Sequence, residues 1–235
     1  MKNFMDFTSD KVDVFHLVID RSGSMDGDRD NVVRGLNDYK TSFENFPEKG
    51  SIAVAISRFN SSIEFGPFTS IDDMDLHYST GGGTALYYAI TMGAEHLHEY
   101  INEIIQTKSI VPKATFIVFS DGHPEGEDYP RDKAVEAINQ LNMAGITTVF
   151  VAFGGAIESK FGDSMGFEST RDVHNRGDLE HFLGVELSKS CKEQSRSLKG
   201  LGANFFSKAV KENSSSGYSG ATQQVLEDDS WIDDI

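Results

Sequence analysis

The chain has 235 residues, of which 38% are hydrophobic, so it is long enough to bury one complete core. Its formal net charge of −16 at pH 7 opposes attraction to nucleic acid phosphates and to anionic lipid surfaces. The sequence also contains no run of 18 apolar residues and a single cysteine, which excludes a membrane-spanning helix and an internal disulfide framework.

Residues 1–10 contain no basic region followed by an apolar stretch, so we expect no secretory signal. The cysteine, Cys191, falls at a core-like spacing in a predicted helix, and we assign it to packing rather than to zinc binding. We therefore expect a cytoplasmic protein. Its acidic charge favours cations, or protein partners with basic surfaces, as ligands.

The first half of the chain alternates strand and helix patterns. Residues 12–19 form an apolar stretch typical of a strand buried on both faces, and apolar side chains at intervals of three and four predict a helix over residues 32–46. A second buried strand is predicted at residues 52–56. The turn sequence at residues 60–62 then predicts a short antiparallel edge strand at residues 63–65.

The second half continues the alternation. It predicts a long amphipathic helix that starts near Thr84, buried strands at residues 114–119 and 146–153, and helices at residues 134–141 and 179–191. Residues 154–177 show no clear period, and a short last strand near residues 171–173 is the one element that their pattern indicates.

This alternation predicts an α/β, doubly wound sheet that is mostly parallel, with helices on both faces. We place this domain at residues 1–198. Residues 199–235 have the composition of a flexible linker followed by an acidic tail, which we expect to be disordered. The tail contains the only tryptophan, Trp231, and it either aids solubility or carries a docking motif.

Oxygen-bearing side chains lie in three short segments that the predicted fold brings to one edge of the sheet. Asp20, Ser22 and Ser24 follow the first strand, Thr84 follows three glycines at the start of a helix, and Asp121 follows the strand at residues 114–119. Ligands of such sheets bind beyond the carboxyl ends of the strands. Two carboxylates and three hydroxyls are hard ligands that suit Mg²⁺, with Ca²⁺ or Mn²⁺ as alternatives, better than zinc.

The charge of this ligand set indicates a role for an outside ligand. A divalent cation bound by Asp20 and Asp121 is formally neutral, so it can still attract a glutamate or aspartate of a protein partner as a sixth ligand. Acidic residues nearby in the sequence would repel an acidic partner unless they point away. We therefore expect a partner with one coordinating acid inside a basic rim. The neighbouring acids are Asp26, Asp28, Asp30, Glu125, Glu127 and Asp128.

Other metal-dependent classes fit the spacing less well. An EF-hand that starts at Asp20 requires glycine and glutamate where Met25 and Asn31 stand. Residues 81–83 lack the Lys-Ser/Thr that completes a phosphate-binding loop. A metal-dependent phosphohydrolase needs a base beside the metal, and His123 is the only histidine next to these segments. We therefore favour a binding protein over an enzyme and keep the hydrolase as an alternative.

Together, these three motifs resemble the metal-ion-dependent adhesion site of von Willebrand factor A domains. The resemblance covers roughly residues 10–195, and all five positions match in order and in separation. It implies a Rossmann-like sheet with the metal at its top. It also implies that Ser22 and Ser24 are direct ligands, while Thr84 and Asp121 alternate between direct and water-mediated contact.

Within that family, the architecture is most similar to bacterial tellurite-resistance proteins of the Y type. This similarity implies a Mg²⁺-dependent adaptor in a tellurite-resistance, stress-response or phage-defence system, with a kinase or phosphatase of the same gene cluster as partner. The acidic tail does not belong to that pattern. Self-association, in which the tail supplies the sixth ligand to another copy, is a further alternative.

Overall fold

A six-stranded sheet in the order β3-β2-β1-β4-β5-β6 forms the centre of the computed structural model, which describes residues 11–124, 127–155, 157, 159–197 and 200–206. Its strands are parallel except for β3, which pairs antiparallel with β2. In chain order they are β1 (Asp13–Asp20), β2 (Ile52–Phe59), β3 (Ile63–Glu64), β4 (Lys113–Ser120), β5 (Thr147–Phe153) and β6 (Ser169–Val173).

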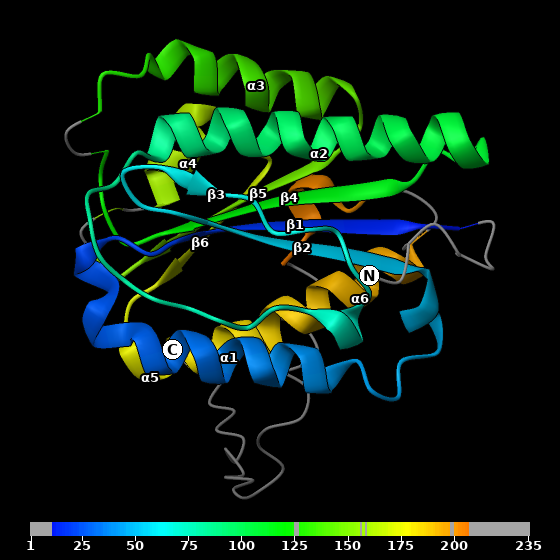
Figure 1. Cartoon of the computed structure of the whole chain (residues 1–235), viewed down its shortest axis with the longest axis horizontal. Helices are drawn as coiled ribbons and strands as arrows, with labels where there is room; N and C mark the ends of the chain where they lie inside the picture. Colours follow the sequence, from blue (N-terminus) through cyan, green and yellow to red (C-terminus); the bar gives the residue numbers. More distant parts are fainter. Residues whose placement is uncertain (1–10, 125–126, 156, 158, 198–199, 207–235) are drawn as a thin grey trace, which may run out of the picture.

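Helices cover both faces of the sheet (Figure 1). One layer consists of α2 (Leu86–Lys108), α3 (Arg131–Met143) and α4 (Ser159–Met165). The opposite layer consists of α1 (Arg29–Ser42), α5 (Arg176–His181) and α6 (Ser188–Arg196), with a π-helical segment, Phe182–Leu187, between the last two. A 3₁₀ helix, η1 (Gly23–Asp28), leads from β1 into α1. The predicted doubly wound α/β fold with one antiparallel edge strand is thus confirmed.

The two layers enclose two apolar cores because side chains alternate along each central strand. On β1, Phe15 and Leu17 belong to the core beneath α1, whereas Val14 and Val18 belong to the core beneath α2. Strands buried on both faces read as continuous apolar runs, and this property made β1, β2, β4 and β5 predictable from sequence.

The largest differences from the predicted elements lie after residue 154. The region contains a helix, α4, that the sequence pattern did not indicate, and β6 is longer than the predicted residues 171–173 and pairs parallel with β5. Packing also continues beyond residue 198, because Leu201, Phe205 and Phe206 are buried in the core beneath α1. The predicted acidic tail with Trp231 lies outside the described residues.

Among the described residues, no helix is both long enough and apolar enough to cross a membrane.

A buried histidine lies in the core beneath α2. His16 of β1 is 0% exposed, and its Nε2 lies 2.7 Å from Ser57 Oγ. The ring of His96 from α2 packs edge-on at 5.3 Å between centroids. Burial, and secondarily the charge of His96, lowers the pKa of His16 from 6.5 to about 3. His16 is therefore neutral in the folded protein at neutral pH.

This burial predicts a loss of stability in mild acid. Between pH 6.5 and about 3 the unfolded chain protonates His16 and the folded chain does not, so the free energy of unfolding falls as the pH falls. One such group contributes a slope of up to about 1.4 kcal/mol per pH unit. Burial also lowers the pKa of His96, although the charge of Glu99 opposes this shift. His96 therefore adds to the slope in the same direction.

Urea unfolding at several pH values between 4.5 and 7 measures this slope. We expect His16→Gln to have a shallower dependence than the wild-type chain, and the exposed-site control His123→Gln to match the wild type. Equal slopes for His16→Gln and the wild type would contradict the prediction.

Candidate metal centre

The five predicted ligands lie on three loops at one end of the sheet. Asp20 is the last residue of β1, and Asp121 follows the last residue of the adjacent parallel strand β4. Because parallel neighbours end at the same edge, these two carboxylates are brought close together. Thr84 lies just before α2, whose first turn is at the same end of the sheet as η1 (Figure 1).

Hydrogen bonds connect four of the five predicted ligand residues. The Ser22 and Ser24 hydroxyls are 3.0 Å apart, and Ser24 Oγ donates to Asp121 Oδ1 at 2.8 Å. The backbone N–H of Ser22 donates to Asp20 Oδ1 at 2.8 Å. Thr84 Oγ1 lies 3.9 Å from the point where a side chain on Gly122 would begin. The segments that the sequence predicted to meet therefore do meet.

Two residues that the sequence analysis did not single out hold Asp20 in place. Ser120 Oγ donates to Asp20 Oδ2 at 2.6 Å, and the hydroxyl of buried Tyr78 donates to the Asp20 carbonyl oxygen. The position of Ser120 at a strand end, next to Asp121, was the available signal for its role. Tyr78 carried no such signal, because it lies in a loop without periodicity.

The glycine loop before Thr84 approaches the first ligand loop through its backbone. Gly23 N–H donates to the Gly82 carbonyl oxygen at 3.0 Å, and Gly81 N–H donates to the Arg21 carbonyl oxygen at 2.9 Å. Gly81 and Gly82 have φ values of 141° and 84°, which favour glycine. A side chain at Gly82 would also begin 3.1 Å from Nδ2 of Asn60. The backbone conformation thus favours glycine at both positions, and at Gly82 the close neighbours favour it as well.

Burial disfavours the charged form of both carboxylates. Burial raises the pKa of Asp20 to about 6, with hydrogen bonds from Ser120 and Ser22 opposing the shift and the charge of Asp121 adding to it. Burial also raises the pKa of Asp121, which the Ser24 hydroxyl opposes. A cation between the two would favour the ionised form of each.

The donor set fits a hard divalent cation. Asp20, Ser22 and Thr84 are 0%, 2% and 5% exposed, whereas Ser24 is exposed, so the site opens to solvent near Ser24. The described residues contain no group of three or more His, Cys, Asp or Glu side chains suited to a metal ion. Two carboxylates with three hydroxyls match the oxygen ligands of Mg²⁺ or Mn²⁺ rather than the nitrogen and sulfur ligands of structural zinc.

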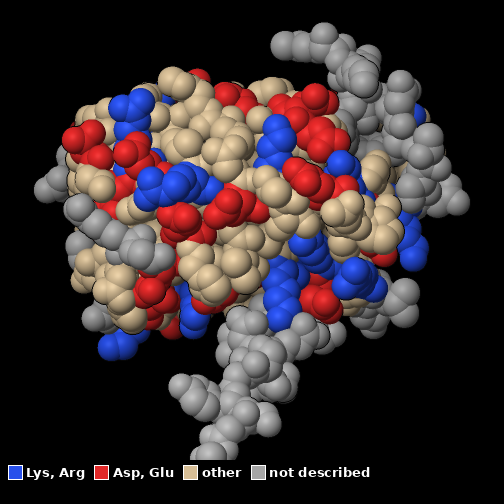
Figure 2. Space-filling model, turned by 90° about the horizontal axis from the view of Figure 1, so that it is seen from below, with Lys and Arg blue, Asp and Glu red and all other residues tan. Residues whose placement is uncertain are grey.

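Three of the neighbouring acids are engaged within the fold, and the first of them, Asp28, is buried and accepts a hydrogen bond from Asn31 Nδ2 at 3.4 Å. Asp26 accepts a hydrogen bond from Thr80 Oγ1 at 2.8 Å, and Glu127 accepts from backbone N–H groups of α2. Glu125 lies outside the described residues. Figure 2 shows that basic and acidic side chains are interspersed on the face covered by α1, rather than forming one continuous acidic field.

His123, the candidate base of the hydrolase alternative, is exposed and packs edge-on against Phe161 at 6.2 Å between ring centroids. Among the hydrogen bonds of the described residues, none joins His123 to a predicted ligand. The geometry thus gives no specific support to a hydrolase.

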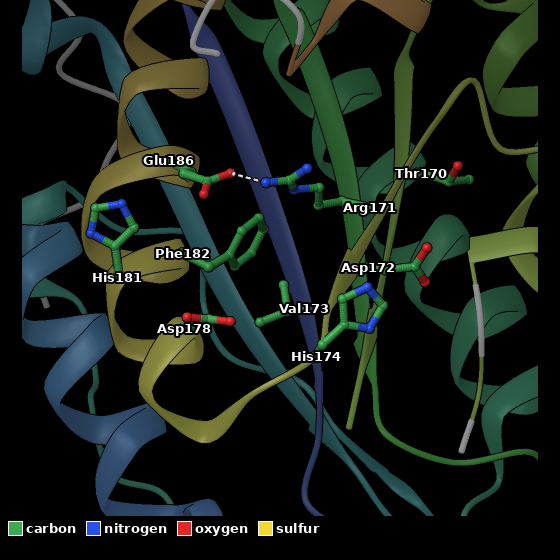
Figure 3. Close-up of a pocket in the computed structure, with 9 residues that line it drawn as sticks. All are labelled: Thr170, Arg171, Asp172, Val173, His174, Asp178, His181, Phe182 and Glu186. Carbon is green, nitrogen blue, oxygen red and sulfur yellow. Dashed lines mark hydrogen bonds and ion pairs between the residues drawn. The ribbon is translucent and has the colours of Figure 1, made fainter. Parts of the chain in front are cut away.

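A separate pocket of about 470 Å³ lies between β6 and the α5 region, and none of the predicted ligands lines it. Within it Arg171 bonds Glu186 at 2.9 Å (Figure 3). Asp172 accepts two hydrogen bonds from Ser159, which lies outside the pocket lining. We assign no function to this pocket.

No protein-family model and no curated protein matches this chain. Solved structures do match it. The pilus adhesin SpaC from Lactobacillus rhamnosus GG, in an open conformation, aligns with a TM-score of 0.63 at 14% identity over 80% of this chain and 30% of SpaC. Manganese-loaded Plasmodium vivax TRAP protein aligns with a TM-score of 0.51 at 17% identity over 74% of this chain and 72% of TRAP.

A third structure is proximal thread matrix protein 1 from the mussel byssus, with a zinc-occupied MIDAS motif (metal-ion-dependent adhesion site). It aligns with a TM-score of 0.54 at 15% identity over 77% of this chain and 46% of the mussel protein. This chain therefore spans less than half the length of SpaC and of the mussel protein. At these identities the comparisons establish the fold alone: the chain has an α/β fold like that of von Willebrand factor A domains.

Proposed function

We propose that this chain is a metal-dependent protein-binding module that performs no chemistry itself. Asp20, Ser22, Ser24, Thr84 and Asp121 would hold a divalent cation, with Mg²⁺ as the physiological candidate. The observation that carries the proposal is the hydrogen-bonded path from Ser22 through Ser24 to Asp121, which joins the loops after β1 and β4. The fold also supports the proposal, because a manganese-loaded protein and a protein with a zinc-occupied MIDAS motif have the same fold.

The partner is expected to present a carboxylate. Two aspartates neutralise a divalent cation, and the exposure of Ser24 leaves an approach from solvent. A glutamate or aspartate of another protein can therefore complete the coordination shell. The bound cation would supply the attraction, and the surrounding loops would select the partner by shape and charge.

We further propose the biological setting that the sequence resemblance implies. The chain would act in the cytoplasm as an adaptor of a tellurite-resistance, stress-response or phage-defence system, with a kinase or phosphatase of the same gene cluster as its partner. The domain would extend to Phe206, which packs in the core beneath α1, and the proposed linker and tail would follow it. Tail-mediated self-association stays a prediction.

Calorimetric titration of the purified chain with Mn²⁺ and with Mg²⁺ tests the metal site directly. We expect one equivalent of metal to bind and to raise the unfolding temperature, because the cation binds the folded site and not the unfolded chain. Titration in the presence of excess EDTA is the blank. Absence of heat and absence of thermal stabilisation with both metals would refute the proposed function.

A further inference from the structure

Glu127 caps the helix that follows Thr84. Its Oε2 accepts a hydrogen bond from the backbone N–H of Tyr87 at 3.0 Å, and its Oε1 accepts one from the N–H of Tyr88 at 2.5 Å. The first N–H groups of a helix have no partner within the helix. Ala85, at the N-cap position of α2, provides no side-chain cap. A residue about forty positions later in the chain therefore performs this task.

The same residue belongs to the loop that carries Asp121. Glu127 lies six positions after Asp121, and Thr84 lies two positions before the first residue of α2. The carboxylate of Glu127 thus bridges the segments that supply these two predicted ligands. Its half-buried position raises its pKa, which the hydrogen bonds from the α2 backbone oppose.

Thr84 depends on such indirect contacts for its position. Among the hydrogen bonds of the described residues, none joins Thr84 to another predicted ligand. On one side its loop is held by the turn after β2, where Ala85 N–H donates to the Asn60 carbonyl oxygen at 2.7 Å and Gly83 N–H donates to Ser61 Oγ at 2.9 Å. On the other side, Glu127 connects α2 to the Asp121 loop.

We propose that Glu127 is a positioning residue of the metal centre: by capping α2 it fixes Thr84 relative to Asp121 and thereby sets the affinity for the cation. The inference rests on the proposed function. Outer groups that orient metal ligands typically change metal affinity about 10- to 100-fold when removed. A purely structural cap would instead lower the stability of the fold and leave metal affinity unchanged.

The test compares Mn²⁺ affinity, measured by calorimetry, among the wild-type chain, Glu127→Ala, Glu127→Gln and Asp128→Asn. The control Asp128→Asn removes an exposed charge from the next position of the same loop, so it accounts for the loss of long-range attraction. We expect affinity to fall about tenfold in Glu127→Ala. Glu127→Gln keeps one acceptor oxygen and should fall less, and Asp128→Asn should stay within about twofold of the wild type.

Amide hydrogen exchange in EDTA provides a second readout. Faster exchange at Tyr87 and Tyr88 in Glu127→Gln, together with a weaker affinity than in Asp128→Asn, supports the inference. The inference is overturned if Glu127→Gln binds Mn²⁺ as tightly as Asp128→Asn while the two amides exchange faster. Glu127 would then be a structural cap only. If the wild-type chain does not bind Mn²⁺, the proposed function fails together with the inference. This result differs from the one that overturns the inference alone, in which the wild-type chain binds Mn²⁺.

Discussion

Replacing Asp121 by alanine is expected to abolish measurable Mg²⁺ and Mn²⁺ binding, and with it metal-dependent capture of the partner. The substitution removes one of two carboxylates and the acceptor of the Ser24 hydroxyl. A divalent cation would then keep an uncompensated charge beside Asp20. We expect at least about a 100-fold loss of metal affinity, the upper end of the range for lost supporting groups, measured by calorimetry.

The fold of Asp121→Ala should survive. Its unfolding temperature, measured with and without metal, separates loss of metal binding from loss of folding. Burial raises the pKa of Asp121, so its charged form destabilises the metal-free fold at neutral pH. Asp121→Ala is therefore expected to unfold in EDTA at the temperature of the wild type or above it, while losing the stabilisation that Mn²⁺ gives. The matched control is Asp132→Asn, an exposed charge at the start of α3. Metal binding retained in Asp121→Ala would rule out the proposed site.

Asp20 and Asp121 could be predicted from the sequence because each carboxylate stands at the end of an apolar strand pattern. The apolar runs of β1 and β4 lead directly into Asp20 and Asp121, and parallel strands of one sheet end at one edge. The sequence pattern therefore indicated both the strands and the meeting of their loops. Only Thr84 required the additional inference that a helix starts at that edge.

The supporting residues could not be predicted, because long-range contacts define them. Glu127 reads as one acid among several in its loop, and only the fold brings it to α2. The helix α4 has seven residues with Gly162 and Met165 as its buried positions, too few for a period. A side chain at Gly162 would begin 2.7 Å from Phe150 Cβ, a close approach of two elements that no local pattern contains.

Replacing Lys113 by methionine is expected to cause the largest loss of stability among the single changes considered. Lys113 Nζ lies 3.1 Å from Asp13 Oδ1 and donates to the carbonyl oxygens of Gln194, Ser195 and Ser197 at 2.7, 2.8 and 2.7 Å. Asp13 is 2% exposed. Removing Lys113 leaves the buried Asp13 carboxylate without its principal opposite charge. The cost is expected to be up to about 3–5 kcal/mol, which urea unfolding at pH 7 would measure.

Two comparisons isolate the buried charge as the cause. Lys133→Met breaks an exposed pair with Glu136 and should cost no more than about 1 kcal/mol. Adding Asp13→Asn to Lys113→Met should recover part of the loss, because the uncharged amide tolerates burial better than an unpaired carboxylate.

Burial already raises the pKa of Asp13, and Lys113 opposes that shift. Without Lys113 the folded chain binds a proton at Asp13 more readily than the unfolded chain does, so stability falls as the pH rises. The cost of Lys113→Met should therefore be smaller at pH 4.5 than at pH 7, and a cost independent of pH would assign the effect to the lost carbonyl contacts instead.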